Sequence, residues 1–144
     1  MFCFPRTVLH QAGPALALAI AALACEAGAA APELPPQPAR MDADGVQRVA
    51  LVGGSYFFHP AHILVRADRP LEITLTQEPG LIPHRFVLEG PDGQRLADVS
   101  LDTEAKTVRL TLKAGDYVFH CPNRLFHLKS HRERGMAGVL QVRE

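Results

Sequence analysis

Short runs of β-branched and apolar residues, separated by turn signals, fill the chain from Val46 to its C-terminus. Two of them, Leu71–Thr76 and Val108–Lys113, alternate apolar and polar side chains, which is typical of strands with one buried face. No stretch after residue 46 sustains a helical period of useful length. This many strands in about 100 residues predict an all-β domain, built as an antiparallel sandwich or barrel. We expect strands at Gln47–Val52, Ser55–Phe58, Ile63–Arg66, Leu71–Gln77, Arg85–Glu89, Asp98–Leu101, Thr107–Leu112, Asp116–Cys121 and Gly138–Val142.

The composition is that of a folded, neutral chain. Of its 144 residues, 47% are hydrophobic and 21% are charged, which excludes disorder of the whole chain and allows one domain of ordinary size. The 15 Lys and Arg residues balance the 15 Asp and Glu residues. A neutral chain is not expected to coat nucleic acid or an anionic membrane surface, so we expect no nucleic-acid partner.

The first 31 residues differ from the rest and predict a secretory signal peptide. The run Pro14–Ala24 is apolar, yet it is shorter than the about 20 residues that span a bilayer. Small residues follow it and predict cleavage near Ala29–Ala31. A retained membrane anchor and a lipoprotein modified at Cys25 remain alternatives. The pattern predicts export to the periplasm, with membrane contact only if the N-terminus is retained or lipidated.

Residues 32–45 contain four prolines and two aspartates and predict an extended linker. The folded domain is therefore expected to cover residues 46–144.

Export leaves the mature chain with one cysteine, Cys121, because Cys3 and Cys25 belong to the signal segment. A lone thiol in an oxidising compartment is a small buried hydrophobe, a metal ligand or a nucleophile. Its neighbours distinguish these roles. Strand alternation places Tyr117, Phe119 and Cys121 on the inner face, at the end of a strand, and turns His120 away from it.

Three further soft or nitrogen donors accompany Cys121. His131 and Met136 follow it in the chain, and His84 begins a strand after a turn rich in proline and glycine. One thiolate, two imidazoles and a thioether form a set that suits copper in electron transfer, with Met136 as the weak axial ligand.

At these residues the sequence resembles the small periplasmic cupredoxins, the blue-copper proteins of the plastocyanin and azurin type. The matching motifs are Tyr56-Phe57-Phe58-x-Pro60, Pro83-His84, Gly115-x-Tyr117-x-Phe119-x-Cys121 and His131-x4-Met136-x-Gly138. The resemblance implies a Greek-key β-sandwich. It also implies one copper ion, held by His84 from one loop and by Cys121, His131 and Met136 from another. The redox partner would be a protein such as a cytochrome or a membrane oxidase complex.

Two departures from the family pattern affect the expected site. Nine residues separate Cys121 from His131, more than in the commonest cupredoxins, so His127 is a rival for the second imidazole. We favour His131 because it keeps the spacing to Met136. In the family, an Asn that ties the two loops often follows the first ligand His, whereas here Arg85 follows it.

The sequence favours an electron carrier over an enzyme. It has no paired carboxylates in a shared motif, no glycine-rich phosphate loop and no Gly-x-Ser-x-Gly. Two alternatives remain: a copper carrier or sequestration protein with the same ligands, and a thiol enzyme with Cys121 as the nucleophile and His131 or His127 as the base. His59 and His62 are only a weak signal for a second metal site.

The segment between Cys121 and Met136 carries a local positive bias. It is either a solvated loop or a docking rim for an acidic redox partner. Its basic residues, set against Glu133, are Arg124, Lys129, Arg132 and Arg134.

Overall fold

The computed structural model describes residues 35–144. The predicted signal peptide and the first residues of the predicted linker lie outside this part of the chain. Within residues 35–144, no helix is long and apolar enough to cross a membrane.

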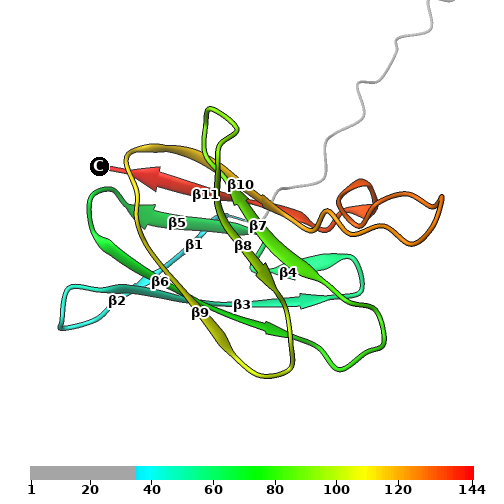
Figure 1. Cartoon of the computed structure of the whole chain (residues 1–144). Helices are drawn as coiled ribbons and strands as arrows, with labels where there is room; N and C mark the ends of the chain where they lie inside the picture. The colour runs from blue at the N-terminus through cyan, green and yellow to red at the C-terminus, as the bar shows by residue number, and fades with distance from the viewer. Residues whose placement is uncertain (1–34) are drawn as a thin grey trace, which may run out of the picture. The chain divides into compact units, whose positions relative to one another are not determined.

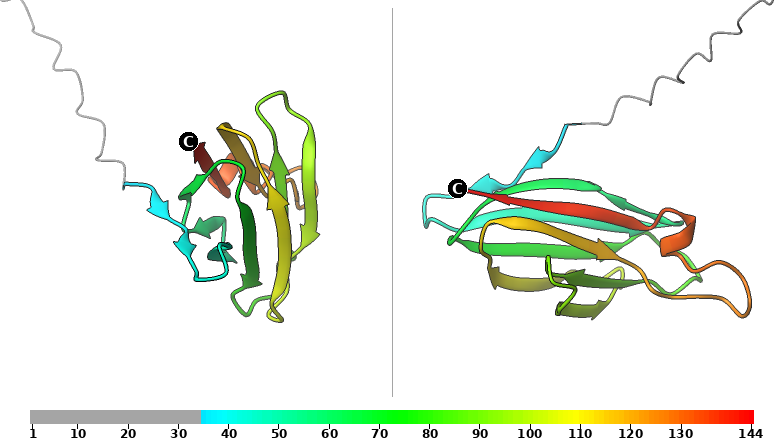
Figure 2. Two further views of the ribbon diagram at one scale, coloured as in Figure 1. Left: turned by 90° about the vertical axis from the view of Figure 1, so that its left-hand side faces the viewer. Right: turned by 90° about the horizontal axis from the view of Figure 1, so that it is seen from above.

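Two sheets packed face to face form the domain (Figures 1 and 2). The six-stranded sheet has the order β1-β5-β11-β10-β7-β8, and the five-stranded sheet has the order β2-β3-β6-β9 with β4 paired to β3. A short 3-10 helix, η1 (Arg132–Arg134), precedes the last strand. The strands are β1 (Gln37–Pro38), β2 (Arg40–Met41), β3 (Gln47–Gly54), β4 (Phe57–His59), β5 (His62–Arg66), β6 (Pro70–Gln77), β7 (Arg85–Glu89), β8 (Arg95–Ser100), β9 (Lys106–Thr111), β10 (Gly115–His120) and β11 (Ala137–Arg143).

All nine expected strands are present, most within one or two residues of their predicted ends; β8 begins at Arg95, three residues before Asp98. The prediction of an all-β sandwich is confirmed, but the expectation of purely antiparallel sheets is wrong. Strand β3 pairs with β6, and β5 with both β11 and β1, in parallel. The chain leaves one sheet for the other between β3 and β6, so the two strands are joined by a crossover and not by a hairpin.

Part of the predicted linker belongs to the sheets. Gln37–Pro38 lies parallel to β5, and Arg40–Met41 pairs antiparallel with β3. Between them, the Ala39 N–H donates to the Leu64 carbonyl at 2.8 Å. Proline is tolerated here because both segments are edge strands, where one side of the backbone needs no partner.

Three aromatic rings form the part of the core next to the end of β10. Phe58 meets Phe119 edge-on, with ring centroids 5.5 Å apart, and Phe86 stacks on Phe119 at 5.6 Å. All three rings are buried. Each comes from a different strand, so the rings fix the end of β10 against both sheets.

Gly138 provides the space that this cluster needs. It lies opposite Phe119 in the β10–β11 register, and a Cβ atom there would collide with the Phe119 ring and with the Ala61 carbonyl oxygen. Any side chain at this position must therefore push a packed ring or the backbone aside.

We predict that Gly138→Ala lowers the free energy of unfolding by about 1–3 kcal/mol, the usual cost of overpacking. Chemical denaturation measures it. The matched control is Gly80→Ala, because a Cβ atom at Gly80 would meet only the Glu78 carbonyl oxygen, at 3.9 Å. Equal stabilities of the two variants would contradict the packing role of Gly138.

Candidate metal centre

The ends of three neighbouring strands bring the predicted ligands together. Strands β7, β10 and β11 are adjacent in the six-stranded sheet. His84 directly precedes β7, Cys121 directly follows β10, and Met136 directly precedes β11. His131 stands at the start of η1, in the loop between β10 and β11. Sheet pairing therefore brings His84, Cys121 and Met136 to one end of the sandwich, and the loop before β11 adds His131.

His84, Cys121 and His131 form a buried cluster. The Nδ1 atoms of the two imidazoles lie 3.1 Å apart, and the Cys121 Sγ lies 3.4 Å from the His131 Nδ1. The donor atoms of all three residues lie within 4.8 Å of one another. Two facing Nδ1 atoms require that one of them carries a proton or that both bind one ion. A thiol and two imidazoles that converge in this way are a soft donor set and fit a copper ion.

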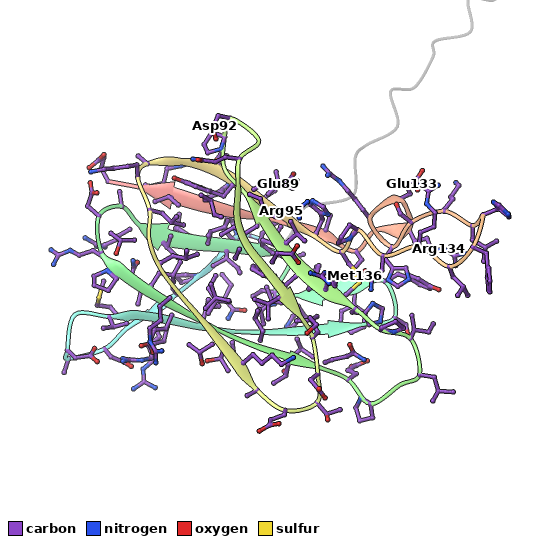
Figure 3. All side chains as sticks on the ribbon, in the orientation of Figure 1. Glu89, Asp92, Arg95, Glu133, Arg134 and Met136 are labelled. Atoms are coloured by element: carbon purple, nitrogen blue, oxygen red, sulfur yellow. The ribbon has the colours of Figure 1, made fainter. Side chains whose placement is uncertain are left out.

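Met136 is fully buried at the same end of the sandwich, where Figure 3 labels it. Its backbone joins both arms of the cluster: the Met136 N–H donates to the His131 carbonyl at 2.9 Å, and the Met136 carbonyl accepts from the Cys121 N–H at 3.0 Å. A Cβ atom on Gly53 would lie 2.5 Å from the Leu101 Cδ1 atom and 3.2 Å from the Met136 methyl group, so this glycine leaves room for both side chains.

The long interval between Cys121 and His131 closes on itself. The Asn123 carbonyl accepts from the His131 N–H at 2.8 Å, and the Cys121 carbonyl accepts from the Arg132 N–H at 3.0 Å. Residues 124–130 therefore form a separate excursion, and the chain returns to the cluster at His131. His127 lies on this excursion and is exposed to solvent.

Burial sets the protonation of the cluster. It lowers the pKa of His84, with a smaller contribution from the charge of His131, and it lowers the pKa of His131, with a smaller contribution from Arg134. Both pKa shifts favour the neutral imidazole, which is the form that binds a metal. Burial raises the pKa of the Cys121 thiol, although backbone N–H groups of Arg85 and Asn123 oppose it by donating to the sulfur. A metal must therefore displace the thiol proton.

The other histidines of residues 35–144 lie outside the cluster. Strand alternation turns His120 away from Cys121, and its Nε2 lies 3.2 Å from a Glu89 carboxylate oxygen. His59 and His62 line an apolar hollow of about 300 Å³ beside Pro60. No group of three metal-binding side chains within residues 35–144 includes any of these histidines.

Asn123 is a site residue that the sequence motifs did not predict. Its Nδ2 donates to the Pro83 carbonyl at 2.8 Å, directly before His84, so it ties the two ligand loops together. The signal in the sequence was Arg85, which stands where the family often has the connecting Asn. The Arg85 side chain turns outward and donates from Nε to Asp98 at 2.9 Å.

Tyr56 also belongs to the site. Its ring meets the His131 imidazole edge-on, at 5.0 Å between centroids, and packs against the Arg134 guanidinium at 4.7 Å. It restricts the rotation of the His131 ring.

A scan against protein-family models finds no match, and a search of curated proteins finds none. Solved structures do match. The metal-binding domain of the Cu(I)-exporting P-type ATPase CopA of Streptococcus pneumoniae is 20% identical, with a TM-score of 0.57, over 76% of this chain and 97% of that domain.

Two auracyanins are similar as well. Dithionite-reduced auracyanin from Roseiflexus castenholzii is 18% identical, with a TM-score of 0.55, over 66% of this chain and 95% of its own. Auracyanin A from Chloroflexus aurantiacus, a blue copper protein, is 18% identical, with a TM-score of 0.53, over 68% and 99%. At such identities the similarity establishes the fold, and it confirms the fold that the sequence motifs predicted. The domain of residues 35–144 thus has the cupredoxin fold.

Proposed function

We propose that the protein binds one copper ion through His84, Cys121, His131 and Met136 and transfers electrons in the cell envelope. The observation that carries this proposal is the convergence of a buried thiol and two buried imidazoles within 4.8 Å. Copper, when bound, supplies a one-electron couple between Cu(I) and Cu(II).

The residues of the chain determine how that couple is held. Cys121 provides a thiolate once its proton is displaced, and the Arg85 N–H donates to its sulfur at 3.3 Å. Such a hydrogen bond withdraws electron density from the sulfur and tunes the site. His84 and His131 provide neutral nitrogens. Met136, whose backbone is hydrogen-bonded to His131 and Cys121, would supply a thioether sulfur to the ion.

A rigid support favours electron transfer, because ligands that do not move allow both oxidation states to share one geometry. The backbone bonds of Met136, the Asn123 side chain and the Tyr56 ring each restrain a different part of the cluster. The aromatic core below the end of β10 adds further support.

The protonation of Cys121 argues against catalysis. A nucleophilic cysteine has a lowered pKa and access to solvent. Cys121 is fully buried, and burial raises its pKa. These properties support a ligand and not a nucleophile, and we propose no enzymatic role.

Copper handling is the second candidate function. It is favoured by the structural similarity to a metal-binding domain of a Cu(I)-exporting ATPase, with a TM-score as high as those of the auracyanins. The reduction potential and the rate of copper loss to a mild chelator separate the two functions, because a carrier must release its metal readily.

The location and the partner are proposals from the sequence. The predicted signal peptide supports a periplasmic protein. The proposed redox partner is a protein such as a cytochrome or a membrane oxidase complex.

Replacement of the proposed thiolate tests the copper site. Titration of the wild-type protein with Cu(II) is expected to give intense thiolate-to-copper charge transfer in the visible spectrum, complete at one equivalent. Cys121→Ser should remove this band while circular dichroism shows the same β-rich fold. A Cys121→Ser variant that keeps the charge-transfer band would contradict the assignment of Cys121 as a copper ligand.

The two candidate imidazoles provide a matched pair for the same titration. His131→Ala should shift or abolish the charge-transfer band and the electron paramagnetic resonance hyperfine pattern, whereas His127→Ala should leave both unchanged. The reverse result would assign the ligand role to His127.

Acid is expected to destabilise the metal-free protein through His84 and His131. The pKa of each imidazole is lowered in the folded state, whereas imidazoles of the unfolded chain protonate near 6.5. As the pH falls below about 6.5, the unfolded chain binds protons that the folded chain does not, so the free energy of unfolding decreases. Urea denaturation at neutral pH and at about pH 5.5 measures the difference. Substitution of both residues by Gln should remove most of it, and an unchanged difference would contradict this origin.

Loss of the Asn123 side-chain bond is expected to loosen the site. Asn123→Ala removes the donor to the Pro83 carbonyl, a bond worth about 0.5–1.5 kcal/mol, and should change the hyperfine pattern and accelerate copper loss to a chelator. Asn123→Asp keeps the size but cannot donate, so it should behave like the Ala variant. If both variants keep the wild-type spectrum and rate, Asn123 does not position the ligands.

A further inference from the structure

Exposed large apolar side chains gather at the ligand end of the domain. Among residues 35–144, seven large apolar side chains are exposed. One of them, Met41 in β2, lies at the opposite end of the domain. The six at the ligand end are Phe57, Leu81, Ile82, Leu125, Phe126 and Leu128. Scattered apolar residues on a surface need no explanation, but a concentration at one end marks an interaction site.

Five of these side chains form what we call the apolar tip: Leu81, Ile82, Leu125, Phe126 and Leu128. A turn closed by the Leu128 N–H and the Leu125 carbonyl, at 3.1 Å, presents Phe126 to solvent with 85% of its surface exposed. Phe126 has a positive φ of 50°, a conformation that bulky residues rarely adopt, and its ring gains no burial in return. The segment 122–130 stands out beyond the strands in both Figures 1 and 2.

The second loop of the tip, residues 79–83, carries no charged residue. It is held against the first loop by the hydrogen bond from Asn123 to Pro83. The bond joins the bases of the two loops at the ligand end of the domain.

Basic residues flank the apolar tip in the sequence. Between residues 122 and 136, four basic residues and one acidic residue leave a net charge of plus three, although the whole chain is neutral. The acidic residue, Glu133, pairs with Arg124 at 3.1 Å, and Glu89 of β7 lies 3.8 Å from the Arg132 guanidinium. We call the four basic residues the basic collar: Arg124, Lys129, Arg132 and Arg134.

We propose that the apolar tip inserts into the interface of an anionic lipid bilayer while the basic collar binds the lipid headgroups. A protruding apolar turn flanked by basic residues fits such a membrane, because the apolar side chains can enter the hydrocarbon boundary while the basic side chains reach the negative headgroups. A protein partner would need a complementary hollow for Phe126, whereas lipid adapts to any shape. This contact is separate from the predicted N-terminal segment and does not depend on copper.

The absence of tryptophan from the sequence permits a direct test with the full chain. Phe126→Trp places a single fluorophore in the tip. The matched control is Met41→Trp, at the opposite end of the domain. Each protein is mixed with vesicles of phosphatidylcholine alone or of phosphatidylcholine with about a third phosphatidylglycerol, with and without brominated acyl chains.

With anionic vesicles, the emission of Phe126→Trp is expected to shift to shorter wavelength and to be quenched by the brominated chains, and high salt should weaken both effects. Met41→Trp should show neither effect. The substitutions Lys129→Gln and Arg132→Gln, added to Phe126→Trp, should raise the lipid concentration that gives half of the maximal shift. The expected increase is about fivefold for each charge removed, because each basic residue near the surface contributes about 1 kcal/mol. Lys113→Gln, at the far end, is the charge control.

Three results would overturn the proposal. If Phe126→Trp shows no shift with either vesicle while circular dichroism reports a folded domain, the apolar tip is a docking surface for a protein. If both tryptophans respond equally, adsorption is unspecific. If the shift is the same with neutral vesicles and is unaffected by salt, the basic collar plays no part.

Discussion

The pairing of β7, β10 and β11 is the constraint on which the rest of the site depends. His84, Cys121 and Met136 each adjoin an end of one of these strands, so the sheet ladder sets their separation before any ligand arrives. The aromatic rings beneath β10 and the absence of a side chain at Gly138 allow close packing at this point. A donor set that is assembled by the backbone costs little further ordering when a metal binds.

Much of this arrangement could be predicted from the sequence because it follows from local periodicity. Alternation in β10 predicted that Cys121 faces inward, and turn signals separated the strands. The distinction between His131 and His127 rested on the context of Met136. In the structure, the hydrogen bond from the His131 N–H to the Asn123 carbonyl closes residues 124–130 into a loop. His131 therefore lies next to Cys121 in space although nine residues separate them in the sequence.

Contacts between distant segments could not be predicted in the same way. The parallel pairing of β3 with β6 depends on where the chain crosses between sheets, which no local pattern records. The Asn123 bond to Pro83 joins loops 40 residues apart. Arg85 stands where the family often has the Asn that ties the two ligand loops, so the sequence indicated that this Asn is missing. Only the folded loops show that Asn123 ties them instead.

The two short strands at the start of the domain have a consequence for solubility. Strand β1 pairs with the outer edge of β5, and β2 pairs with β3. One short stretch of chain therefore covers backbone groups of both sheets. Uncovered strand edges recruit further strands and lead to aggregation. The proline in β1 offers no N–H to a newcomer, so the edge strand that protects the sandwich is itself a poor template for growth.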